Sequence, residues 1–184
     1  MKIRYYVADA FTDRPFHGNP AGVCLLEKAI DDETMQNIAF ENNLSETAFL
    51  VRKAAGQYNL RWFTPEAEID LCGHATLATA FVLFNHENHE GDVIQFHSHR
   101  SGALPVTRNG ALLTLNFPTD VFEPIELTAE ILDCFHRKPT GAFKGKTDFM
   151  VVFDTEEAIK INRFFKLVTL KSDKVHFPCT SAFA

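Results

Sequence analysis

Glu46 is the residue whose surroundings are least expected for its type. It lies in the stretch Leu44 to Val51, which is mostly apolar and predicts a strand. Since successive side chains of a strand point to opposite faces, Glu46 shares a face with Leu44, Ala48 and Leu50. Loss of water disfavours a charged carboxylate, which suits a carboxyl group that gives and takes protons near neutral pH. Glu46 is therefore a candidate general acid/base, and the alternative is a strand-end glutamate that reaches solvent.

Cys72, Gly73 and His74 form a second reactive set, at the start of an apolar stretch that predicts a helix. A helix N-terminus presents unpaired N–H groups, so the amides near Gly73 and His74 could hold a substrate carboxylate. His74 can also donate a hydrogen bond or a proton, and the positive helix end favours a thiolate at Cys72. The alternative is structural: a tight turn at Gly73, a satisfied histidine and a small core cysteine.

Asn19 is a third and weaker candidate. It lies in the turn-rich stretch Gly18 to Gly22, where its amide can donate and accept a hydrogen bond at once. Taken by itself this turn has no specific function, but it is a possible ligand contact.

Histidines are the obvious place to look for a metal site. His86, His89, His97 and His99 are close in sequence, but no acidic residue or cysteine stands at a matching ligand spacing. The sequence also contains neither a glycine-rich phosphate loop nor a Gly-x-Ser-x-Gly motif. We therefore predict no metal site and no nucleotide-type cofactor.

The elements that must position these residues mix strands and helices. Alternating apolar residues predict strands at residues 3–7, 21–26, 44–51, 58–63, 93–96, 103–106, 112–117 and 148–153. Helical spacing and turn signals predict helices at residues 31–42, 73–84, 127–136 and 155–170. The helix at 73–84 is apolar on nearly every side, which indicates a buried central helix. These elements predict the α+β class, with a boundary near Pro118.

The boundary divides the chain unequally. Residues 1–117 read as a complete α+β half, and residues 118–184 as a linker and the incomplete start of a second half. Short turns at Ser101-Gly102 and Asn109-Gly110 join the last strands of the first half as hairpins.

Composition excludes several classes of protein. The chain has 18 Lys and Arg against 24 Asp and Glu, a net charge of −6, with no basic run that would bind nucleic acid or an anionic membrane. The longest apolar stretch, Ala75 to Phe84, is half of the roughly 20 residues that a membrane span needs. The first residues lack the apolar core of a signal peptide, so a cytoplasmic location is expected. The four cysteines lie far apart, as is typical of reduced thiols.

Four segments, taken together and in this order, resemble the N-terminal half of the phenazine-biosynthesis (PhzF-like) isomerase family. They are Gly18 to Val23, Asn43 to Phe49, Arg61 to Pro65 and Glu68 to Thr76. A looser resemblance continues from Asp148 to about residue 170. The resemblance implies a fold similar to diaminopimelate epimerase: two pseudo-symmetric α+β halves, each a curled mixed sheet around a central buried helix, with the active site between them.

The resemblance also implies roles for the candidate residues. Glu46 matches the catalytic glutamate that moves a proton on a small carboxylate-bearing metabolite, without cofactor or metal. Gly73 and His74 match the helix start that contacts substrate, and Asn19 matches a turn that faces the cleft. Cys72 occupies the place of the thiol in related cysteine-based racemases, so it is either a spectator or a second acid/base.

One departure from the family pattern qualifies the function. The Asp-x-x-x-Gly-Ser type motif of the family's second half is missing between Pro118 and Ala184, so we expect a truncated second half. The alternative function is therefore a non-catalytic family member that acts at most as a binding module. Because the family's halves are pseudo-symmetric, a homodimer that rebuilds a cleft from two copies is a third expectation.

Overall fold

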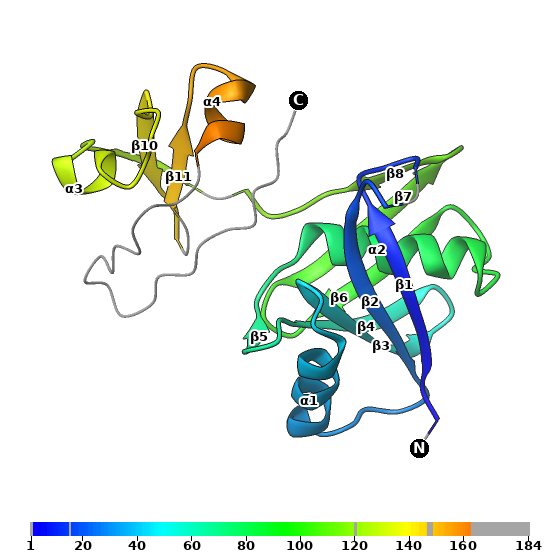
Figure 1. Cartoon of the computed structure of the whole chain (residues 1–184). Coiled ribbons are helices and arrows are strands. Elements are labelled where there is room, and N and C mark those ends of the chain that lie inside the picture. The colour runs from blue at the N-terminus through cyan, green and yellow to red at the C-terminus, as the bar shows by residue number, and fades with distance from the viewer. Residues whose placement is uncertain (1, 15, 120, 147–148, 163–184) are drawn as a thin grey trace. The chain divides into compact units, whose positions relative to one another are not determined.

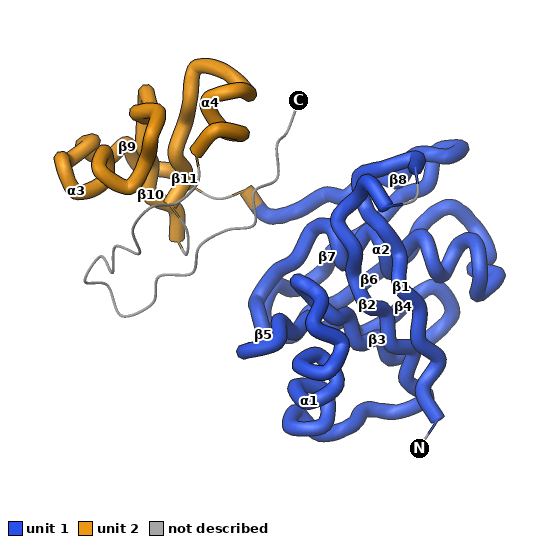
Figure 2. The backbone as a smooth tube through the Cα atoms, in the orientation of Figure 1, with its two compact units in different colours: residues 1–118 blue, residues 119–184 orange. Residues whose placement is uncertain are grey.

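The computed structural model divides the chain into two units, residues 1–118 and 119–184 (Figure 2). It describes all residues except 1, 15, 120, 147–148 and 163–184. Each unit has its own sheet, and the candidate residues Asn19, Glu46, Cys72, Gly73 and His74 all belong to the first unit.

The first unit is built on one mixed sheet of eight strands (Figure 1). Its strands are β1 (Arg4–Ala10), β2 (Asn19–Leu26), β3 (Glu46–Ala54), β4 (Gln57–Phe63), β5 (Glu68–Ile69), β6 (Val93–Ser98), β7 (Gly102–Asn109) and β8 (Leu112–Leu115). Their order is β1-β2-β3-β4-β6-β7-β8, and the short β5 pairs with β4. The pairs β2–β3 and β4–β6 are parallel and the others are antiparallel, so each parallel pair needs a crossover connection.

Helix α1 (Asp32–Asn42) makes the crossover from β2 to β3. Its start is fixed by Asp31, whose carboxylate accepts a hydrogen bond from the backbone N–H of Thr34 at 2.8 Å. Its end is fixed by Asn43, which adopts a left-handed conformation with φ of 49°. Both ends fall where the acidic and amide residues of the sequence predict them.

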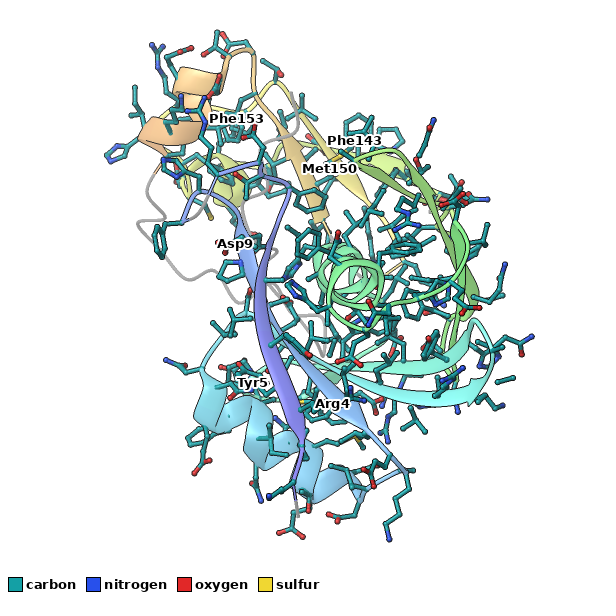
Figure 3. All side chains as sticks on the ribbon, turned by 90° about the vertical axis from the view of Figure 1, so that its right-hand side faces the viewer. Arg4, Tyr5, Asp9, Phe143, Met150 and Phe153 are labelled. Atoms are coloured by element: carbon teal, nitrogen blue, oxygen red, sulfur yellow. The ribbon has the colours of Figure 1, made fainter. Side chains whose placement is uncertain are left out.

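Helix α2 (Gly73–Asn85) makes the crossover from β4 to β6, and the sheet curls around it. Figure 3 looks along this helix, with strands on several of its sides. Nine of its residues are buried: His74, Ala75, Thr76, Ala78, Thr79, Ala80, Val82, Leu83 and Phe84. The prediction of a buried central helix within a curled mixed sheet is confirmed.

Strand alternation divides the core between the two helices. On β3, Ala48 and Leu50 pack in the large apolar cluster around α2, and Phe49 packs in the smaller cluster with Met35 and Ala39 of α1. Since side chains two residues apart share a face, the pleat directs Glu46 to the α2 side. The predicted strand began at Leu44. The observed strand begins at Glu46, because the left-handed Asn43 is followed by a bend.

The hairpin predictions are confirmed on β6, β7 and β8. Gly102 and Gly110 have φ of 76° and 61°, conformations that glycine adopts without strain. The segment from Glu66 to Cys72 contains the two-residue strand β5, which is too short to show a periodic pattern in the sequence.

The second unit holds a three-stranded antiparallel sheet in the order β11-β10-β9. Its elements are β9 (Glu123–Ile125), α3 (Ala129–Leu132), β10 (Gly141–Lys144), β11 (Phe149–Val152) and α4 (Glu156–Ile161). The helix predicted at 127–136 was wrong in length, because no residue of the four-residue α3 is buried. Strands β9 and β10 were missed. The predicted helix at 155–170 ends at Ile161, and its part beyond residue 162 lies outside the described residues.

Within the described part of the chain, no helix is long and apolar enough to cross a membrane.

Candidate functional site

Glu46 opens β3 at a place fixed by both neighbouring strands. In the parallel pair with β2 it stands opposite Ala21, and the next residue, Thr47, stands opposite Phe63 of β4. Its side chain is only 14% exposed. A carboxyl group held this way on the face toward α2 has little water around it and little freedom to move.

His74, the second residue of α2, brings the helix start to this carboxylate. Its Nε2 lies 3.0 Å from Glu46 Oε2. On the other side of the ring, Nδ1 lies 3.4 Å from Cys72 Sγ. The imidazole therefore lies between a carboxylate and a thiol, and the three residues form a continuous chain of groups that can hold a proton.

The contact between Glu46 and His74 is close, but it is not a hydrogen bond. Oε2 and Nε2 are both buried, and neither has a hydrogen-bond partner. One further buried side-chain atom of the described residues shares this condition, Nε1 of Trp62. Trp62 stands opposite Ala48 in the β3–β4 pair, so it lies on the same face of the sheet as Glu46. Buried polar atoms are normally satisfied, so these three atoms are exceptions on one face of the sheet.

The start of α2 adds donors of its own. Cys72 is the N-cap residue in an extended conformation, and its side chain makes no capping hydrogen bond to the helix. The first intrahelical hydrogen bond runs from Thr76 N to Cys72 O, which leaves the N–H groups before it outside the helical ladder. A methyl group on Gly73 would meet Phe117 Cε2 at 3.5 Å, an ordinary contact, so the fold itself does not require glycine there.

Asn19, the first residue of β2, lies beside the turn that precedes Glu46. The hydroxyl of Ser45 donates to Asn19 Oδ1 at 3.3 Å. Gly18 is closely surrounded, because an added Cβ would lie 2.5 Å from the carbonyl oxygen of Ala10. The structure thus places the five predicted residues on adjoining elements. Asn19 contacts Ser45, which precedes Glu46, His74 contacts both Glu46 and Cys72, and Gly73 lies between Cys72 and His74 in the chain.

A network of charges holds the loop that leads to Cys72. Arg61 binds both oxygens of Glu68, with Nε at 2.6 Å and Nη2 at 2.9 Å, and it also binds Asp32 at 2.7 Å. Arg100 donates to Glu68 at 2.7 Å and to Asp70 at 2.9 Å. These hydrogen bonds and charges raise the pKa of Arg61 and lower the pKa of Asp32.

The sequence did not reveal this network or the buried Trp62 nitrogen. Arg61 and Glu68 stand on paired strands, and Arg100 follows β6. Their positions in the sequence have neither helical nor heptad spacing, so no charge pattern identifies which residues form ion pairs. A glutamate beside a short strand and an arginine in a turn are each ordinary surface residues when read singly.

The four histidines that the sequence analysis rejected as a metal site each contact different residues. His86 stacks on Tyr6 with ring centroids 5.7 Å apart, and His89 contacts the hydroxyl of Tyr58 at 3.3 Å. His97 is exposed, and His99 lies 3.9 Å from Glu68. Within the described residues, the group whose donors could jointly hold a metal ion is Glu46, Cys72 and His74, with ligand atoms within 4.8 Å of one another.

Comparison with known proteins gives a consistent picture. The phenazine biosynthesis-like family, PhzC-PhzF, matches residues 8–160. A protein of Pseudomonas aeruginosa described as an uncharacterized isomerase is 46% identical over 159 residues, which cover 86% of this chain and 60% of that protein. The mouse phenazine biosynthesis-like domain-containing protein 2 is 48% identical over 126 residues, 64% of this chain and 43% of its own length.

Solved structures agree with these relatives. The crystal structure of a PhzF-family phenazine biosynthesis protein from Enterococcus faecalis is 46% identical, with a TM-score of 0.80 over 90% of this chain and 62% of its own. A predicted epimerase from Pseudomonas aeruginosa, 24% identical with a TM-score of 0.65, shares the fold over 90% of this chain and 64% of its own. The epimerase-like α+β architecture expected from the sequence is confirmed, and the chain spans about 60% of the length of such relatives.

Proposed function

The chain belongs to the phenazine biosynthesis-like family, PhzC-PhzF, and from that premise we propose that it is an isomerase that moves a proton on a small carboxylate-bearing metabolite. Glu46 is the general acid/base of this proposal. No cofactor takes part in the step, since one carboxyl group can both remove and return the proton.

The observation that carries the proposal is the meeting of Glu46 Oε2 with His74 Nε2 at 3.0 Å, both buried and neither in a hydrogen bond. A purely structural glutamate would have its acceptor atoms satisfied. An acid/base needs an open lone pair aimed at the substrate, and in this proposal the carboxyl proton of Glu46 exchanges with solvent before it is returned.

In the proposed step, Glu46 Oε2 removes a proton from a carbon made acidic by an adjacent unsaturated group or carboxyl group. Where that group is a carbon–carbon double bond, the electron pair of the broken C–H bond forms a new double bond, the old double bond opens, and Glu46 returns its proton to the far carbon. Where the group is a carboxyl group, the electron pair is held as an enediolate and Glu46 returns its proton to the same carbon. His74 orients the carboxyl group and supplies a hydrogen bond as charge develops on the substrate. Cys72, which contacts the Nδ1 side of the ring, orients His74 and is a spectator to the proton transfer.

The substrate carboxylate binds at the start of α2 in this proposal. The free amide N–H groups near Gly73 and His74 and the positive helix end both favour a negative group there. Asn19 offers its amide nitrogen from the side of β2, since its oxygen already accepts from Ser45. These three contacts fix a small acid relative to Glu46.

The active form in this proposal is an assembly of two chains. The chain spans 60% of the length of the Pseudomonas aeruginosa relative. In this proposal a second copy of the chain packs against the site in a homodimer, as two pseudo-symmetric halves would. Light scattering behind a sizing column tests this directly, and a monomer at all concentrations favours the alternative of a non-catalytic binding module.

The test of the chemistry is proton exchange in deuterated water. Small unsaturated and α-amino carboxylates are incubated with the protein, and deuterium incorporation at carbon is followed by NMR. We expect Glu46→Gln to reduce incorporation by about 10²-fold or more. The matched control is Glu66→Gln, an exposed glutamate of the loop before β5. Incorporation that survives Glu46→Gln would remove Glu46 from the role of acid/base.

A further inference from the structure

We propose that Glu46, Cys72 and His74 form a binding site for a soft divalent cation, with Zn²⁺ as the probe, and that the ion occupies the place of the substrate. A thiolate, an imidazole and a carboxylate are three donors that zinc accepts together, and three protein ligands leave a fourth position open. The inference rests on donor types and distances, so it stands apart from the isomerase proposal, although both concern the same residues.

Glu46 and His74 are already close enough to share one ion. Zinc bonds to nitrogen and to carboxylate oxygen are each about 2.0–2.2 Å long, so two such ligands on one tetrahedral ion lie roughly 3.3–3.5 Å apart. Oε2 and Nε2 lie 3.0 Å apart, close to that separation. Neither atom is in a hydrogen bond, so no existing bond has to be broken when an ion comes between them.

Cys72 supplies the third donor. A zinc–sulfur bond is about 2.3 Å long, which puts a thiolate roughly 3.5 Å from a nitrogen ligand of the same ion. Cys72 Sγ lies 3.4 Å from His74 Nδ1, which is the other ring nitrogen from the one that Glu46 contacts. One ion binds only one nitrogen of the ring, so Cys72 or Glu46 turns about its side-chain bonds to complete the set. The donor atoms all lie within 4.8 Å of one another, so this movement is small.

The charged side chains of the neighbouring loop are paired with one another. The carboxylates of Glu68 and Asp70 and the guanidinium groups of Arg61 and Arg100 bind one another in the loop before Cys72. No Lys or Arg of the described residues forms an ion pair with Glu46. Binding at neutral pH displaces the thiol proton of Cys72 to solvent, so the cation gains a thiolate ligand and one proton is released.

The experiment measures binding of the metal alone to the full chain. Zn²⁺ is distributed between the protein and a chromogenic chelator, and Co²⁺ replaces it for spectroscopy. We expect one ion per chain, proton release, and a thiolate-to-cobalt charge-transfer band in the near ultraviolet. Absence of that band from the unmodified protein overturns the proposal without the need for any variant.

Variants assign the ligands. Cys72→Ser is expected to abolish the band and to weaken zinc binding at least tenfold, and Glu46→Gln is expected to weaken zinc binding while the band remains. Two variants serve as matched controls and are expected to keep full affinity for zinc. Cys134→Ser alters a partly exposed thiol just after α3, and His97→Ala removes an exposed imidazole. If a control variant loses the ion and Cys72→Ser retains it, the site lies elsewhere and the proposal fails. Failure of the exchange assay leaves this binding result unaffected.

Discussion

Glu46, the first residue of β3, and His74, the second residue of α2, place two buried and unbonded polar atoms 3.0 Å apart. Both come from elements anchored in the core: β3 is paired on both edges, and α2 is surrounded by the sheet. The separation is therefore set by the packing of strand against helix, and a loop movement is not needed to form it. Such preorganisation is what an acid/base pair requires.

The first prediction concerns His74. His74→Gln keeps a hydrogen-bonding side chain but moves its donor away from Oε2, so proton exchange is expected to fall about tenfold or more, and less than in Glu46→Gln. The rate of deuterium incorporation is the measurement, with the far-ultraviolet circular dichroism spectrum as the check on folding. An exchange rate equal to that of the unmodified chain would mean that His74 is only a packed core residue.

A second prediction compares two glycines of the site. Gly18→Ala is expected to lower the free energy of unfolding by about 1–3 kcal/mol, because its Cβ would lie 2.5 Å from the Ala10 carbonyl oxygen. Gly73→Ala is expected to keep full stability, since its Cβ would meet Phe117 at 3.5 Å. If Gly73 lies against the substrate carboxylate, exchange falls in Gly73→Ala although the fold is intact. Urea unfolding and the exchange assay separate the two cases, and equal stability losses would contradict the prediction.

Local patterns predicted most of the first unit. The ends of α1 follow from Asp31 and Asn43, and the hairpins from Gly102 and Gly110, because each of these residues determines the backbone next to it. Burial of α2 follows from its apolar composition. Glu46 was singled out by a carboxylate on an apolar strand face, a signal that is also contained within one segment.

The contact of Glu46 with His74 and Cys72 could not be predicted from spacing. It arises because β3 pairs in parallel with β2 and α2 packs against the same face of both strands. Such a topology is determined by the packing of the whole unit. The resemblance to a family suggested shared function for these residues but gave no distances. In the second unit, Leu127 to His136 has the spacing of a helix, but α3 buries none of its residues, so tertiary packing does not extend it.

A third prediction concerns acid and helix α1. Hydrogen bonds from Thr34, backbone N–H first and then hydroxyl, lower the pKa of Asp31. Because the folded-state pKa lies below the unfolded value, the stabilisation is present above about pH 4 and is lost as pH falls through the folded-state pKa. The melting temperature of Asp31→Ala is therefore expected to lie below that of the unmodified chain at neutral pH, and the difference is expected to shrink in acid. A difference that stays constant would rule out the charged cap.

A fourth prediction concerns Cys24. Burial raises the pKa of this thiol to about 12, so almost none of it is thiolate at neutral pH. We expect iodoacetamide to leave Cys24 unmodified in the folded protein and to alkylate it after denaturation, as read by peptide mass spectrometry. Cys134, which is only partly buried, is the internal comparison and reacts first. Rapid alkylation of Cys24 under native conditions would show that β2 opens from α1.

The fifth prediction tests whether the charge network positions the site. Arg61→Lys keeps the charge but loses the planar fork that binds both oxygens of Glu68, so the free energy of unfolding is expected to fall by about 1–2 kcal/mol. The expected loss of stability is smaller than for a fully buried ion pair, because the Arg61 side chain is 24% exposed. Arg52→Lys, at the exposed end of β3, is the matched control and is expected to change little.

The network lies next to the site along the chain, which gives this variant a second consequence. Glu68 belongs to β5, and Arg100 binds both Glu68 and Asp70 from the turn after β6. The segment that these contacts hold ends two residues before Cys72. When Arg61 no longer grips Glu68, the amides from Leu71 to His74 are expected to exchange with deuterated solvent faster than in the unmodified chain, whereas the amides of β2 keep their rates. Faster amide exchange confined to α1 would mean that Arg61 stabilises only α1, through Asp32, and does not position the start of α2.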